Sequence, residues 1–265
     1  DAHDHVERVQ PGHHEVEAEE QLGGALQLVF TASSGAGPCA AAAQTRGCIV
    51  GHNRVVSSLR GARRLAFKSD ETTNTSGDRD FDRALAHTLS YISDRFGVLP
   101  GFAFLQDGNA PNAYASSSDA LGRKDGSVMF GLKLLSQTLK LPEHPDAHVA
   151  AICAHEFGHI CQFKSGIIDK LEKGFTTAKR VELHADYLAG YYAGLRRRER
   201  RDFPAAVVAL AQYNLGDDAT NDPDHHGTPD ERGRAVVEGY KAAFERNESF
   251  KAAFDKGVTW AMGVR

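Results

Sequence analysis

The sequence predicts an α+β fold in which a small antiparallel sheet packs beside a helical body. Two observations predict it. Short apolar segments bounded by turn residues fill the region between residues 102 and 130, a pattern typical of strands. Longer segments with apolar residues at helical spacing come before and after that region. Because these segments follow one another without an internal repeat, we expect a sheet and a group of helices around a shared core.

The strands of the predicted sheet are short. We expect them at Phe102–Leu105, Asn112–Ser116 and Ser127–Phe130. Turn residues separate them, with the pairs Asp107-Gly108 and Asp125-Gly126 as the clearest. Strands joined by such turns form a meander, which is why the sheet is expected to be antiparallel.

The first predicted helix runs from Phe81 to Phe96. Its apolar residues recur every three or four positions, and Gly97 ends it. Thr228 is a suitable N-cap for the final helix. The remaining helices are expected from Leu132 to Leu139, from Asp146 to about Lys164, from about Thr176 to Arg198, from Ala205 to Tyr213 and, as the last, from Pro229 to Arg246.

Composition divides the chain into an extension, residues 1–60, and a folded domain, residues 61–265. The extension has four histidines among many acids, followed by a Gly/Ala/Ser-rich stretch from Gly23 to Ala43. Such a composition buries little apolar surface, so we expect a flexible or loosely packed segment. Its histidines are His3, His5, His13 and His14. They could bind metal, although tails of this kind are more often solvated.

The overall charge excludes some classes of partner. Charged residues make up 25% of the chain and the net charge is −4, so no nucleic-acid partner is expected. No stretch reaches the roughly 18 apolar residues of a membrane span, which predicts a soluble protein. Cys39 and Cys48 could pair if the protein is exported, so the compartment stays open between cytoplasmic and exported. Cys153 and Cys161 are expected to pack as small buried hydrophobes.

The motif with the clearest chemistry is His155-Glu156-Phe157-Gly158-His159. On a helix the two histidines project from one face and can meet one metal ion. Zinc favours imidazole nitrogen, and a catalytic zinc site keeps a position open for water. Glu156 is then placed to take a proton from that water. Gly158 costs about 1 kcal/mol inside a helix, which indicates that something approaches the backbone closely there.

A second segment, Glu182-Leu183-His184-Ala185-Asp186, offers the third ligand. Glu182 and Asp186 are four residues apart and share a helix face. Glu182 can ligate zinc, while Asp186 can accept a hydrogen bond from the outer nitrogen of a ligand histidine. His184 lies two residues from Glu182 and so points away from that face. We interpret it as an orienting or a surface residue.

These motifs resemble those of the bacterial neutral zinc metallopeptidases of the gluzincin type. Further motifs, from Gly216 to Asp218 and from His226 to Thr228 with Arg232, add to the resemblance, which covers roughly residues 80–246. It implies a zincin-like domain that binds one zinc ion per chain through His155, His159 and Glu182. It also implies that His226 donates a hydrogen bond to the oxyanion of the tetrahedral intermediate. The neighbouring His225 and His226 can alternatively be exposed loop residues.

The segment Asn112-Ala113-Tyr114-Ala115 resembles a strand of the CAAX-prenyl-protease-like metallopeptidases. In those enzymes the strand lies along the cleft and pairs with an extended substrate. The resemblance implies that these four residues bind a polypeptide. This chain lacks the membrane helices that are typical of those relatives, which argues against a membrane substrate.

The expected function is therefore hydrolysis of peptide bonds in extended polypeptides by zinc, water and Glu156. Two alternatives stay open. One is a zinc-binding scaffold without turnover, against which Glu156 argues because a structural site needs no base. The other is a zinc hydrolase of non-peptide amides, against which the predicted strand argues because edge strands grip extended chains. Cleavage specificity and oligomeric state are left open by the sequence.

Overall fold

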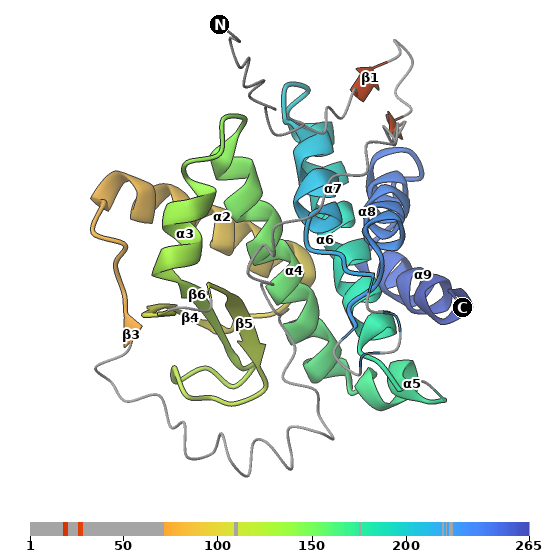
Figure 1. Cartoon of the computed structure of the whole chain (residues 1–265), viewed down its shortest axis with the longest axis horizontal. Coiled ribbons are helices and arrows are strands. Elements are labelled where there is room, and N and C mark those ends of the chain that lie inside the picture. The colour runs from red at the N-terminus through yellow and green to blue at the C-terminus, as the bar shows by residue number, and fades with distance from the viewer. Residues whose placement is uncertain are drawn as a thin grey trace, which may run out of the picture. The chain divides into compact units, whose positions relative to one another are not determined.

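The computed structural model describes residues 18–20, 26–28, 72–108, 111–174, 176–218, 220, 222 and 225–264 (Figure 1). The chain divides into two units, Asp1–Ala42 and Ala43–Arg265. In the first unit, strands β1 (Ala18–Glu20) and β2 (Leu26–Leu28) form an antiparallel pair. The sequence had indicated no strand there. The remainder of the predicted extension, with Cys39, Cys48 and the four early histidines, lies outside the described residues.

The second unit has a four-stranded sheet with the order β3-β4-β6-β5. Its strands are β3 (Thr72–Thr73), β4 (Gly101–Leu105), β5 (Ala113–Ser116) and β6 (Ser127–Gly131). The three strands expected from the sequence are confirmed, and β3 is an addition.

The prediction of a wholly antiparallel sheet is wrong, because the sheet is mixed. Strand β6 pairs antiparallel with β5 but parallel with β4. The physical reason is burial: all five residues of β6 are buried, so this strand gains most from neighbours on both edges. It therefore lies between β4 and β5, and β5 takes the edge.

The helices of the second unit complete an α+β architecture, as predicted. Their bounds are α2 Arg79–Phe96, α3 Leu132–Thr138, α4 Pro145–Ser165, α5 Ile168–Glu172, α6 Lys179–Glu199, α7 Ala205–Tyr213, α8 Pro229–Phe244 and α9 Phe250–Gly263. Gly97 ends α2 with φ of 66°, and Thr228 forms a capping box with Glu231 at the start of α8, so both predicted caps are confirmed. Helices α5 and α9 were not predicted.

Helix α4 occupies the middle of the second unit. It lies between the sheet on one side and α6 on the other (Figure 1). Residues from Ala147 to Gln162 are buried on almost every side of this helix. A helix that is buried all round is surrounded by other elements rather than by water. Cys153 and Cys161 are free thiols buried along it, which confirms their predicted role in packing.

Glycines let α6 and α8 approach closely. A Cβ atom on Gly239 would overlap the carbonyl oxygen of Tyr187, and one on Gly190 would overlap that of Val236. In both cases the obstacle is backbone on the facing helix, which cannot rotate away. The α6–α8 contact therefore depends on the absence of a side chain at these two positions.

We expect Gly239→Ala to lower the free energy of unfolding by about 1–3 kcal/mol, the usual cost of overpacking. The loss should appear even though alanine favours a helix by about 1 kcal/mol over glycine. Gly263→Ala is the matched control, because a Cβ atom there meets nothing within 4 Å. Urea denaturation measures both variants, and a Gly239→Ala protein as stable as the control would contradict the packing argument.

Candidate metal centre

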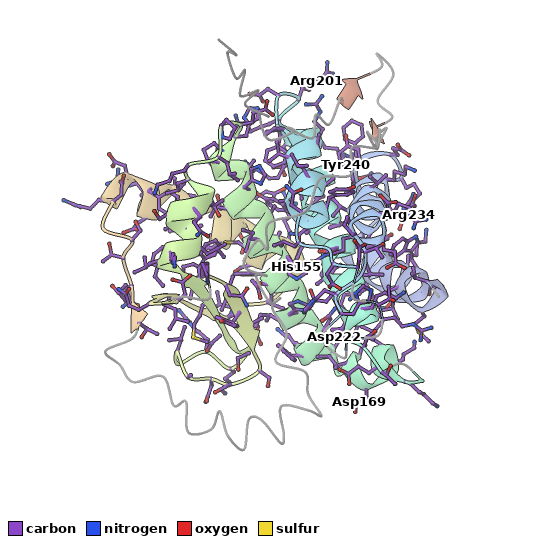
Figure 2. All side chains as sticks on the ribbon, viewed as in Figure 1. His155, Asp169, Arg201, Asp222, Arg234 and Tyr240 are labelled. Carbon is purple, nitrogen blue, oxygen red and sulfur yellow. The ribbon has the colours of Figure 1, made fainter. Side chains whose placement is uncertain are left out.

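The two motif histidines lie at the centre of the second unit. His155 is on the part of α4 that faces α6 (Figure 2). Both histidines are buried, with exposed fractions of 1% for His155 and 0% for His159. The helix that carries them begins at Pro145 and ends before Gly166, which has φ of 66°. The motif residues thus lie within one helix, and their two imidazoles share one face.

Gly158 lies where α4 and α6 come close together. A Cβ atom built on it would be 3.1 Å from the Cα atom of Ala185. This is the close approach that a glycine inside the motif had indicated. Because Ala185 lies between Glu182 and Asp186 on α6, the same contact brings both carboxylates to the two histidines.

Helix α6 completes a three-residue group. His155, His159 and Glu182 each offer one ligand atom within 4.8 Å of the others, and all three side chains are buried. The Nε2 atom of His155 is 3.3 Å from Oε2 of Glu182, and the Nε2 atom of His159 is 3.7 Å from Oε1. The two Nε2 atoms are 3.0 Å apart. This group could hold a metal ion.

The hydrogen bonds of the two rings fix where their lone pairs point. His155 donates from Nδ1 to Oδ1 of Asp186 at 2.8 Å. His159 donates from Nδ1 to Oε1 of Gln162 at 2.9 Å. In a neutral imidazole the other nitrogen then carries a lone pair. Two lone pairs 3.0 Å apart repel each other unless a cation lies between them.

A proton or a metal ion can act as that cation. Burial disfavours the imidazolium form of His155, but the carboxylates of Asp186 and Glu182 outweigh it and raise the pKa of His155 to about 10. Burial, together with the charge on His155, lowers the pKa of His159 to about 3. The buried carboxylates therefore favour a positive charge at this pair of rings, while the closeness of the rings disfavours a second one.

The charges around the group favour a divalent ion. Glu156, Glu182 and Asp186 are all fully buried, and so is the guanidinium of Arg232 on α8. With both imidazoles neutral, as metal ligands are, three carboxylates and one guanidinium leave two negative charges in a region of low dielectric constant, where unbalanced charge is costly. Neither carboxylate oxygen of Glu182 has a hydrogen-bond partner among the described residues. A divalent metal ion would balance the charge and bind this carboxylate.

Asp186 links His155 to Arg232. Its carboxylate accepts two hydrogen bonds from Arg232, from Nε at 2.8 Å and from Nη2 at 2.9 Å. Burial would raise the pKa of Asp186, but Arg232 and His155 outweigh it and keep the pKa below its usual value. Arg232 also donates to Oε1 of Gln212 at 3.1 Å. Asp186 thus contacts His155 from outside the three-residue group, and its role in orienting a metal ligand stays a prediction.

We expect Asp186→Asn to weaken metal binding by about 10–100-fold, the usual effect of losing the partner of a ligand histidine. The amide loses the charge that holds both His155 and Arg232. Competition with a chromophoric chelator measures the affinity. Asp169→Asn is the control, because Asp169 is an exposed carboxylate on α5 (Figure 2). Equal affinities for both variants would show that Asp186 does not orient a ligand.

The loop before α8 carries the predicted histidines. Burial would raise the pKa of Glu182, but the nearby His226 and His155 outweigh burial and lower this pKa. His226 therefore lies close to Glu182. The ring of His225 donates from Nδ1 to Oδ1 of Asp217 at 2.6 Å, while His226 donates its backbone N–H to Oδ2 at 3.2 Å. Neither histidine is an exposed loop residue, with exposed fractions of 1% and 8%.

The predicted substrate strand lies at the edge of the sheet and contacts α4. Asn112 directly precedes β5, and in β5 Ala113 and Ala115 are fully buried while Tyr114 and Ser116 are half-buried. A Cβ atom on Gly126 would meet both the carbonyl oxygen of Ser116 and the side chain of Ile160. Since Ile160 follows His159, the end of β5 lies beside the metal-binding part of α4.

Two buried side chains were missed or left undecided by the sequence reasoning. Gln162 was missed, although its position three residues after His159 on the same helix could have indicated a contact. His184 was interpreted as an orienting or a surface residue. It is fully buried and accepts at Nδ1 from Nε2 of Gln162 at 3.0 Å, so the orienting interpretation agrees with the structure.

No family model matches the chain, and neither a curated protein nor a solved structure matches it. None of the helices in the described part of the chain has the length and apolar character of a membrane span. Any assignment of activity must therefore come from the site itself.

Proposed function

We propose that the chain is a zinc-dependent endopeptidase of the gluzincin type, with a zincin-like domain, that cleaves extended polypeptides. The observation that carries the proposal is the buried group of His155, His159 and Glu182, whose lone pairs and carboxylate converge. Two imidazoles and one carboxylate are the ligand set of several catalytic zinc sites. Such a set leaves one coordination position for water.

Bound zinc would supply a more acidic water and a Lewis acid that polarises the scissile carbonyl. Glu156 would take the proton from the attacking water and transfer it to the leaving amine. Glu156 suits this role because it is buried beside His155 without belonging to the three-residue group. A purely structural metal site has no use for such a carboxylate.

Other residues of the chain would hold the substrate and the developing charge. Because β5 is an edge strand, the segment from Asn112 to Ala115 would pair through its backbone with an extended peptide, which would add a strand to the sheet. His226, close to Glu182, would donate a hydrogen bond to the oxyanion. Asp186 and Arg232 would keep His155 in the tautomer that presents Nε2 to the metal.

The test is metal analysis of the purified chain together with cleavage of an unfolded protein such as casein. We expect one zinc ion per chain, cleavage that a chelator stops, and recovery when zinc is returned. Zinc without cleavage of casein would contradict the peptidase proposal and favour the scaffold or the hydrolase of non-peptide amides. A chain that binds no zinc would overturn the metal centre as well.

A further inference from the structure

A second chain of hydrogen bonds starts at His159 and runs away from the proposed metal position. Oε1 of Gln162 accepts from Nδ1 of His159, and Nε2 of Gln162 reaches Nδ1 of His184 at 3.0 Å. Nε2 of His184 is 3.2 Å from the carbonyl oxygen of Phe254 on α9. Gln162 and His184 are both fully buried. The side chains of α4 and α6 are thus connected to the last helix.

Two backbone carbonyls determine the direction of every bond in this chain. Gln162 donates from Nε2 to the carbonyl oxygen of Val181 at 2.7 Å, so its Oε1 must be the atom that faces His159. His184 must donate from Nε2 to Phe254, because a carbonyl only accepts. Nδ1 of His184 is then an acceptor for the second amide hydrogen of Gln162.

Helix α9 is shaped to receive the His184 ring. A Cβ atom on Gly257 would lie 3.0 Å from Cδ2 and 3.2 Å from Nε2 of His184. The ring of Phe254 meets the imidazole edge to face, with centroids 4.8 Å apart. The glycine therefore leaves the space in which the imidazole reaches the carbonyl of Phe254. This contact gives His184 a fixed position on α9.

We infer that Gln162 and His184 are positioning residues that hold His159 with its Nε2 lone pair toward the metal, and that α9 anchors them. The inference rests on the metal centre proposed above. According to this inference, the two ligand histidines are held in place by hydrogen bonds to different kinds of group. His155 is held by the charged pair of Asp186 and Arg232, whereas His159 is held by a neutral amide and a neutral imidazole. The last helix then belongs to the metal site, although it supplies no ligand.

The first experiment measures zinc affinity of the full chain by chelator competition. Gln162→Met keeps the volume but removes both amide functions, and we expect a loss of about 10–100-fold. His184→Phe should also weaken binding, whereas His184→Gln should restore much of it because an amide can accept from Gln162 and donate to Phe254. The double variant Gln162→Met with His184→Phe should bind zinc no more weakly than Gln162→Met alone, because His184 acts through Gln162.

The control is Gln137→Met, since Gln137 is an exposed amide on α3. Wild-type affinity in a folded Gln162→Met protein would overturn the inference, and so would equal affinities for His184→Phe and His184→Gln. If Gln162→Met fails to fold, the comparison of the two His184 variants decides alone.

The second experiment is independent of zinc. Nitrogen NMR of the imidazoles in the zinc-free chain reports which ring nitrogen of His159 carries the proton. We expect Nδ1–H in the wild type and in Gln137→Met, and a shift toward Nε2–H in Gln162→Met. An unchanged tautomer in Gln162→Met would refute the positioning role. A wild-type chain that shows this tautomer but binds no zinc would refute the proposed function and leave the hydrogen-bond chain in place.

Discussion

Glu156→Gln is expected to keep one zinc ion per chain and the fold while peptide hydrolysis falls by about 10²–10⁴-fold, the usual contribution of a general base. The amide has the same shape as the carboxylate but cannot accept a proton from water. Metal content should not change, because Glu156 lies outside the group formed by His155, His159 and Glu182. The measurements are zinc analysis and the initial rate of casein cleavage at equal zinc loading.

The control for this prediction is Glu143→Gln. Glu143 is exposed just before α4, so its substitution tests whether the loss of any carboxylate near this helix lowers the rate of cleavage. We expect wild-type turnover in the control. A Glu156→Gln protein that cleaves at the wild-type rate would show that another group is the base or that a contaminant cleaves the substrate. A variant that loses its zinc would instead place Glu156 in the metal site.

The residues of the candidate metal centre could be predicted from the sequence because helical periodicity is local. His155 and His159 are four residues apart, as are Glu182 and Asp186, so each pair shares a face of its own helix. Only the meeting of the two helices is non-local. Gly158 indicated this contact, because a glycine in a buried helix marks a place where another element approaches the backbone closely.

The direction of the strands could not be predicted in the same way. Turn residues between β4, β5 and β6 indicate a meander, in which neighbours in sequence are neighbours in space. In the structure β6 lies between β4 and β5 because it is the strand buried along its whole length. That preference depends on what covers the sheet, and α4 is part of that cover. Burial on both faces thus overrides the order suggested by turns.

Helix α9 was missed for a reason connected with the metal centre. Ser249 caps its start through the backbone N–H of Ala252, which is a signal that the sequence contains. Gly257 weakens the helical pattern by about 1 kcal/mol relative to alanine. The structure shows what the glycine does, since a side chain there would collide with His184 and Tyr187. The packing of α9 against His184 and Tyr187 thus requires a glycine that weakens the helical pattern in the sequence.

His159→Ala is expected to reduce bound zinc from one ion per chain to almost none. The variant removes one of three ligands, and once the metal ion is lost the buried carboxylate of Glu182 has less positive charge near it. Zinc that binds only the folded chain stabilises it, by about 2.7 kcal/mol when its concentration is 100 times the dissociation constant. Wild-type protein should therefore melt at a lower temperature after chelation, whereas His159→Ala should melt at one temperature with or without chelator.

His148→Ala is the matched control for that prediction. His148 is buried on the same helix, seven residues before His155 and so on nearly the same face, but it is not part of the metal-binding group. We expect this variant to keep its zinc and to respond to chelator as the wild type does. Full zinc retention by His159→Ala would remove the metal from the position argued here. Loss of zinc from both variants would show that any change on this face of α4 disturbs the site. The loss in His159→Ala would then not identify His159 as a ligand.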